Sequence, residues 1–135
     1  MMNIDEAIIA YLKAHTGLKA LIGARIFFEV LPQGTAFPAV VIQKISDIKD
    51  HYLTGQAELE RPIYQFTAMG LTKASARLVA NQLKSALCDY QGNLSGVAIQ
   101  KVELQNEISS LEKTSDGILE VYYEDLEFEV NFIRS

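Results

Sequence analysis

Residues 25–46, RIFFEVLPQGTAFPAVVIQKIS, decide how the chain is organised. Two apolar runs, residues 25–31 and 38–45, predict two strands joined by a turn. The turn PQGTAFP contains two prolines, which fix their own φ, lack a ladder donor and push the preceding residue toward extended geometry. Its Gly34 can adopt a positive φ. We therefore expect a stiff corner at a well-defined place in the fold.

Composition indicates one globular domain over residues 1–135. A chain of this length commonly forms a single core, and its 49% hydrophobic and 21% charged residues are ordinary for a globular protein. The net charge of −5, from 12 basic and 17 acidic residues, argues against a general nucleic-acid binder. Lys73, Arg77 and Lys84 fall on one side of a predicted helix, which we interpret as a solvated face.

Cys88 is the single cysteine, so an intramolecular disulfide and a multi-cysteine zinc site are excluded. We expect it to be packed as a small hydrophobe. The N-terminus lacks the pattern of a signal peptide, and no apolar run is long enough to span a bilayer. These features predict a soluble, intracellular chain without membrane partners.

The chain before the corner is predicted to be helical. Asn3 is a candidate N-cap, and an apolar stripe at helical spacing follows it up to a stop at Gly17. His15, at the end of this helix, is expected to contact the last carbonyls. A shorter helical turn, residues 18–22, ends at Gly23.

After the second strand comes a long polar segment, residues 46–61. It is predicted to be either a loop or a protruding hairpin with Gly55 at its tip, and loops of this length tend to be functional. We interpret it as an arm that contacts a partner. The candidate contact residues are Asp47, Lys49, Asp50, His51, Tyr52, Gln56, Glu58, Glu60 and Arg61.

The middle of the chain predicts a strand followed by a helix. Pro62 is expected to open the strand, in which alternate residues such as Tyr64 and Phe66 share one face. Thr72 is positioned to cap a helix with an apolar stripe, and Gly92 is the expected positive-φ residue after it. The stripe consists of Ala76, Val79, Ala80, Leu83 and Leu87.

The last third is rich in strand patterns. Residues 97–104 predict a strand, residues 109–117 a turn-rich connector, and residues 118–132 the final strand region. Apolar residues of that region change parity between Tyr123 and Leu126, which predicts a bulge or break near Glu124 and Asp125. The acidic residues Glu120, Glu124, Glu127 and Glu129 are interpreted as a solvated outer face of this strand.

The order is therefore helix, strand, strand, strand, helix, strand, strand. This order predicts an α+β fold, with a mostly antiparallel sheet and two main helices packed on one face.

No pattern in the sequence indicates catalysis or a cofactor. His15 and His51 lack metal-ligand spacing, the glycines form no phosphate-binding loop, and Cys88 has no evident histidine partner. We expect no enzyme activity, no catalytic, cofactor-binding or metal-binding residues, and no cofactor.

The chain resembles the small tail-completion proteins of long-tailed phages and prophages, a group that includes head–tail joining and tail-terminator proteins. The resemblance is strongest in the early helix and in the corner, with its Arg25, Pro32, Gln33, Gly34 and Pro38. It is weaker in the strand–helix unit and in the closing strands, where residues 118–125 are longer and more acidic than the family pattern. The matching positions are Ile26, Phe27, Val30, Val40, Val41, Ile42, Leu104, Glu107, Asp116, Gly117 and residues 125–130.

The resemblance implies a non-enzymatic virion protein that forms a homo-oligomeric, hexameric ring at the head–tail junction. Such a ring would complete the tail and join it to the head, in contact with tail tube and head connector proteins, after assembly in the host cytoplasm. DNA would pass through the bore without specific binding. Our own hypothesis from the charge balance is that Glu120, Glu124, Glu127 and Glu129 line this bore and repel phosphates.

Two alternatives remain open at the level of sequence. One is a head-side adaptor or minor capsid subunit, which the sequence does not separate from a tail-side protein. The other is a non-phage α+β domain that binds a ligand, which would require a pocket with converging polar groups.

Overall fold

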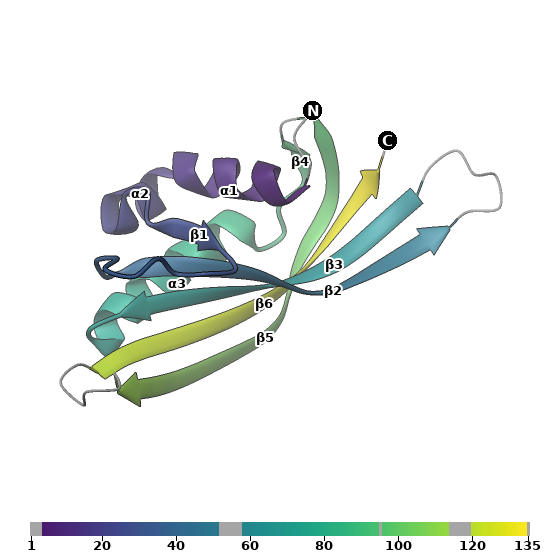
Figure 1. The fold of residues 1–135 in the computed structure, drawn as a ribbon. Coiled ribbons are helices and arrows are strands. Elements are labelled where there is room, and N and C mark those ends of the chain that lie inside the picture. Colours follow the sequence, from purple (N-terminus) through teal and green to yellow (C-terminus); the bar gives the residue numbers. More distant parts are fainter. Residues whose placement is uncertain (1–3, 52–57, 95, 114–119, 135) are drawn as a thin grey trace.

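The computed structural model describes residues 4–51, 58–94, 96–113 and 120–134 (Figure 1). The predicted α+β class is confirmed, with a six-stranded, mostly antiparallel sheet in the order β1-β2-β3-β6-β5-β4. The described residues form three helices, the two main ones predicted and a short one at the predicted helical turn, and all lie together on one side of the sheet (Figure 1). The elements are α1 (Ile4–Ala14), α2 (Thr16–Ile22), β1 (Ile26–Phe28), β2 (Ala39–His51), β3 (Glu58–Gly70), α3 (Lys73–Leu87), β4 (Gly92–Leu94), β5 (Val97–Lys113) and β6 (Glu120–Arg134).

The helical region divides at His15 rather than ending at Gly17. His15 has an extended backbone, and its Nδ1 accepts a hydrogen bond of 3.3 Å from the backbone N–H of Leu18. It is therefore the N-cap of α2. Its backbone N–H donates to the carbonyl of Leu12, in the last turn of α1, at 3.1 Å, so the predicted contact with the last carbonyls of α1 is made by the backbone while the ring caps α2. Gly17 lies inside α2, whereas Gly23 closes α2 with a φ of 60° as expected. The proposed cap Asn3 lies outside the described residues.

The corner is held by Arg25. Its Nε donates to the carbonyl of Pro38 at 2.9 Å, and its Nη2 donates to the carbonyl of Leu21 at 3.3 Å, so one guanidinium ties α2 to the start of β2. Gly34 has the expected positive φ, 82°. The corner residues thus have a structural role.

The two strands flanking the corner pair in parallel, and not as a hairpin. β1 is only three residues long because Glu29, which follows it, has a φ of 71° and so leaves the extended conformation. β1 pairs only with the segment of β2 from Val40 to Ile42.

The polar segment 46–61, which we call the arm, forms a hairpin rather than a loop. The pairing of β2 with β3 continues to His51 and Glu58, whereas Gly55, the expected tip, lies outside the described residues. Pro62 lies within β3 rather than opening it. Its missing N–H is accommodated locally, since the pairing of β3 with β6 stops at Glu60 and resumes at Ile63.

The core lies between the helices and one face of the sheet. The predicted alternation along β3 and the stripe of α3 are confirmed, because Tyr64, Phe66 and the whole stripe are buried. The ring centroids of Phe66 and Phe128 lie 5.6 Å apart in an edge-on arrangement across β3 and β6.

The helix α3 ends differently from the prediction. Cys88 is its C-cap and is exposed, rather than packed in the core. Asp89 follows with a left-handed φ of 59°, before Gly92, which has the expected positive φ. Although Cys88 is exposed, partial burial of its thiol, followed by the negative charge of Asp89, raises the pKa of the thiol.

β5 is longer than predicted, since it continues to Lys113 and includes residues 109–113 of the expected connector. The register shifts of the last hairpin lie in β5, at Gln100 and Gln105, while β6 pairs with β3 in one register throughout. The predicted bulge near Glu124 and Asp125 is therefore wrong. The parity change arises because Glu124 occupies a buried, helix-facing position of a regular strand.

We predict that Phe128→Ala lowers the free energy of unfolding by about 3–5 kcal/mol, because it leaves a cavity beneath the helices. Denaturant unfolding of the purified variant measures this change. Leu78→Ala, at an exposed position of α3, is the control and should stay within about 0.5 kcal/mol of the parent. Similar losses for both variants would contradict the assignment of the core.

Candidate assembly surfaces

The sheet has two long strand edges without a neighbour among the described residues. β4 pairs only with Val97–Ile99 of β5, and the backbone N–H of Asp89 donates to the Val102 carbonyl at 3.0 Å, which leaves residues 103–113 uncovered on the outer side. At the opposite side, β1 covers β2 only as far as Ile42, which leaves residues 43–51 uncovered. Uncovered edges present backbone N–H and C=O groups that can pair with another strand.

Exposed apolar side chains lie beside both edges. Val30 is 70% exposed and Ile45 is also exposed, and both line a hollow next to β2. Ile108 is 48% exposed and Leu111 is also exposed, and both belong to β5. Single exposed apolar residues are common, but their presence along two unpaired edges is typical of a surface that becomes buried.

The arm reaches away from the helices, as Figure 1 shows. Its backbone is strand on both sides, which brings the predicted contact residues Asp47, Lys49, Asp50, His51 and Glu58 onto one hairpin. Glu60 is buried, so it is not an exposed contact residue as predicted. Arg61 is half-buried. Tyr52 and Gln56 lie outside the described residues.

No described helix covers the second face of the sheet, which we call the open face. On it the hydroxyl of Thr67 donates to Asp125 Oδ1 at 2.7 Å, linking β3 to β6. Tyr123 lines a hollow on this face, and burial, followed by the nearby carboxylates of Glu112 and Asp125, raises the pKa of Tyr123.

The four acidic residues predicted to share one wet face are divided between two faces. Glu127 and Glu129 alternate with buried residues of β6 and lie half-buried on the open face, next to Asp125. Glu124 is buried on the helix side. Glu120 is exposed at the start of β6, with an ion pair of 3.9 Å to Lys113. The predicted common face is therefore wrong for Glu124 and Glu120, because strand alternation places both on the face of β6 opposite to Glu127 and Glu129.

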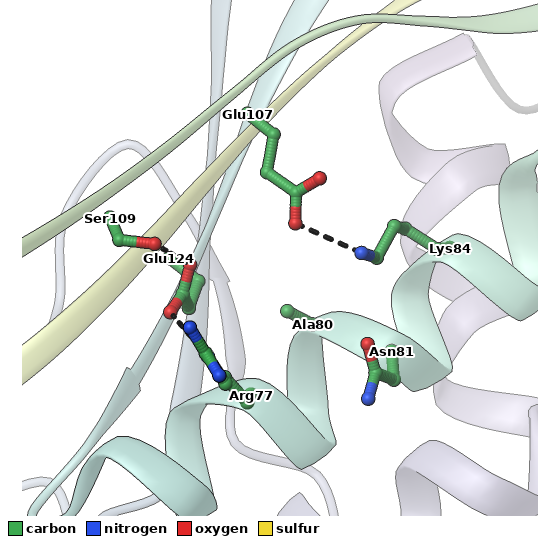
Figure 2. Close-up of a pocket in the computed structure, with 7 residues that line it drawn as sticks. All are labelled: Arg77, Ala80, Asn81, Lys84, Glu107, Ser109 and Glu124. Carbon is green, nitrogen blue, oxygen red and sulfur yellow. Dashed lines mark hydrogen bonds and ion pairs between the residues drawn. The ribbon is translucent and has the colours of Figure 1, made fainter.

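A groove of about 460 Å³ lies between α3 and the second half of β5. Figure 2 shows side chains converging on it from both sides. The Nζ of Lys84 contacts Glu107 Oε1 at 2.9 Å across the groove. The residues that line the groove are Arg77, Ala80, Asn81, Lys84, Glu107, Ser109 and Glu124.

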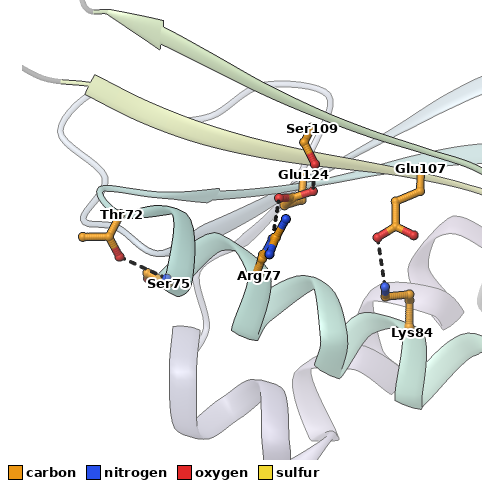
Figure 3. A network of polar contacts seen from close by, with 7 residues as sticks. All are labelled: Thr72, Ser75, Arg77, Lys84, Glu107, Ser109 and Glu124. Carbon is orange, nitrogen blue, oxygen red and sulfur yellow. Dashed lines mark hydrogen bonds and ion pairs between the residues drawn. The ribbon is translucent and has the colours of Figure 1, made fainter.

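Glu124 forms the floor of this groove and is only 4% exposed. The Ser109 hydroxyl donates to its Oε2, and Arg77 Nε lies 3.8 Å from its Oε1 (Figure 3). Arg77 is positioned by the second turn of α3, whose start is capped by the Thr72 hydroxyl oxygen accepting from the Ser75 N–H at 3.0 Å. The groove thus holds a buried carboxylate beneath the exposed Arg77, beside the half-buried Lys84.

Sequence reasoning did not find this groove, although two signals pointed toward it. One was the parity change before Leu126, which marks Glu124 as an inward residue. The other was the basic side of the second helix, interpreted as solvated, where Arg77 and Lys84 instead contact carboxylates of the sheet.

Among the described residues there is no group of three His, Cys, Asp or Glu residues arranged to hold a metal ion. The described helices include none that is both long and apolar enough to span a membrane. The candidate assembly surfaces are the two uncovered strand edges, the open face and the polar groove.

A family model described as "Tail completion protein gp17" matches residues 6–118. The chain belongs to this family. The predicted resemblance is confirmed, and the chain is a structural component of a phage-type virion, in a family of tail proteins.

Two solved structures are similar to this chain in fold. A chain from the "Virion of native gene transfer agent (GTA) particle" superposes with a TM-score of 0.76 at 18% identity, covering 97% of this chain and 95% of that chain. Another solved structure gives a TM-score of 0.52 at 17% identity and covers 96% of each chain. No curated protein matches the chain.

We predict that Ser109→Ala destabilises the fold by about 1–2 kcal/mol, because it removes a hydrogen bond from a buried carboxylate. Thermal or denaturant unfolding tests this. Ser110→Ala, at an exposed position that lines the open face, is the matched control and should have little effect. Equal stability of the two variants would contradict the role given to Ser109.

Proposed function

We propose that this protein forms a homo-oligomeric ring at the head–tail junction, which completes the tail and joins it to the head. The observation that supports this best is the pair of uncovered strand edges on opposite sides of one sheet. Two different edges that meet head to tail form a heterologous interface, and such interfaces close into rings when the rotation permits.

The strand directions favour this arrangement. β2, β3, β6 and β5 are each antiparallel to the next, so β2 and β5 run in opposite directions. A rotation about an axis roughly along the strands preserves direction, so β2 of one copy would join β5 of the next in antiparallel pairing. The result is an antiparallel sheet that continues from copy to copy and pairs the long uncovered edges, which is how closed sheets avoid aggregation.

The open face is our candidate for the wall of the bore. The helices occupy the other face, so a sheet that closes into a ring would present Asp125, Glu127 and Glu129 to the passing DNA. These carboxylates would repel the phosphate backbone and allow DNA to slide without specific binding. Glu124 has no part in this version of the hypothesis, because it is buried on the helix side.

The ring we propose is hexameric, as the family resemblance implies, and assembles in the host cytoplasm. Its partners would be the tail tube protein on one side and the head connector proteins on the other. The arm is the candidate contact with one of them, because a paired hairpin that extends beyond the core offers both edges and side chains for strand addition.

We predict that Ile108→Lys prevents ring closure while the monomer remains folded. A lysine at an exposed edge position opposes strand addition and costs little in the free chain. Native mass spectrometry over a concentration series, with and without purified tail tubes, should show ring-sized species for the parent and monomers for the variant. Leu78→Lys, exposed on α3, is the control and should assemble. A tight dimer with an occupied polar pocket would instead favour a ligand-binding domain.

We also predict that replacing residues 48–59 by an Asn-Gly turn leaves a folded monomer but weakens assembly on the tail. The deletion stops before Glu60, which is buried. In the native register Asp47 pairs with Pro62, so the new connection is the four residues Asn-Gly-Glu60-Arg61, a length that is common in hairpins. Circular dichroism during heating checks the fold, and cosedimentation with tail tubes checks assembly. Loss of cooperative unfolding would mean that the arm belongs to the core.

A further inference from the structure

We propose that the groove between α3 and β5 receives a basic side chain from a second copy of this chain, and that Glu124 binds it. The inference rests on the proposed ring, because the second copy is the one whose β2 joins β5. This ion pair between Glu124 and the second copy, which we call the lock, would add a specific side-chain contact to an interface otherwise made by backbone pairing.

Burying the Glu124 carboxylate costs free energy in the isolated chain. Leu126, Phe128 and Val130, the next residues of β6 on the same face, are apolar and buried, and they fill the core beneath the helices. A carboxylate at such a position costs free energy unless it is well paired. An apolar residue would serve the isolated fold at least as well, which points to a role for Glu124 outside that fold.

The Glu124 carboxylate can accept a hydrogen bond from a further donor. A carboxylate offers about four lone-pair sites. In the described part of the chain its contacts are the Ser109 hydroxyl and Arg77 Nε, and the 3.8 Å to Arg77 exceeds a hydrogen-bond distance. The Arg77 side chain is 60% exposed, so it can turn aside for an incoming cation.

Glu124 lies within reach of a strand added beside β5. Glu107 and Ser109 are exposed on the helix side of β5, at the part of its outer edge that no described strand covers. A strand added there would lie about 4.8 Å from β5 and about 10 Å from β6, a distance that a lysine side chain and Glu124 together can span. The uncovered segment 43–51 of β2 contains two lysines, Lys49 and Lys44. In the free chain the Lys44 ammonium lies 3.8 Å from Asp5 Oδ1 and 5.7 Å from the centroid of the Tyr64 ring, contacts that it would exchange for Glu124.

Charge favours a cation over an anion as the occupant. Arg77 and Lys84 line the groove, but each already faces a carboxylate, Glu124 or Glu107. A bound anion would have to displace these contacts and approach a buried negative charge. An ammonium or guanidinium group would instead increase the pairing of Glu124.

The test compares Glu124→Leu and Glu124→Gln with the parent chain. We expect Glu124→Leu to unfold at the same or a higher temperature, because replacing a buried charge by a packed apolar residue is often neutral or stabilising. Both variants should assemble at least tenfold more weakly in native mass spectrometry with tail tubes. Glu6→Gln, the same change at an exposed position of α1, is the control and should assemble like the parent.

Three outcomes would overturn the inference. If the parent forms rings and Glu124→Leu forms them equally well, the lock is wrong but the ring stands. If Glu124→Leu loses both thermal stability and assembly while Glu124→Gln keeps both, Glu124 has only a structural role. If the parent stays monomeric even on tail tubes, the proposed ring fails, and the lock fails with it.

Discussion

The antiparallel pairing of β3 with β6 is the constraint on which the rest of the structure depends. Neighbouring segments of the chain form the β2–β3 and β5–β6 hairpins, but β3 and β6 are far apart in the sequence. Their pairing keeps a single register from Glu58 and Arg134 to Gly70 and Tyr122. This register packs Phe66 edge-on against Phe128 and creates the buried face that the helices cover. It also places β2 and β5 on opposite sides of the sheet, with their outer edges available.

The sequence predicted those strands and helices in which buried apolar residues recur at a regular spacing. β3 alternates because one face is covered by helices, and α3 has a clean stripe because it lies on that face. The outer half of β5 was not predicted as strand, since it is exposed on both faces and its polar residues carry no burial pattern. The split at His15 was missed as well, because a histidine is not among the usual N-cap residues.

The candidate surfaces were predicted less well, for a related reason. The arm was recognised from its length and polarity, but local sequence does not show that Glu60 faces the core. The groove combines α3 with β5 and β6, so no local motif reveals it. A charged residue at an inward strand position, such as Glu124, is nevertheless a deviation from the pattern that the fold favours. Such deviations tend to occur at sites selected for function.

Hydrogen exchange of the backbone amides tests the central claim, that the two uncovered edges join in the assembled ring, most directly. Exchange would be measured by mass spectrometry on the free protein and on the protein bound to tails. We expect rapid exchange on β5 residues 103–113 and β2 residues 43–51 before assembly, at the amides that point outward. Both segments should then become strongly protected together. Unchanged exchange along both edges in a fully assembled sample would contradict the account.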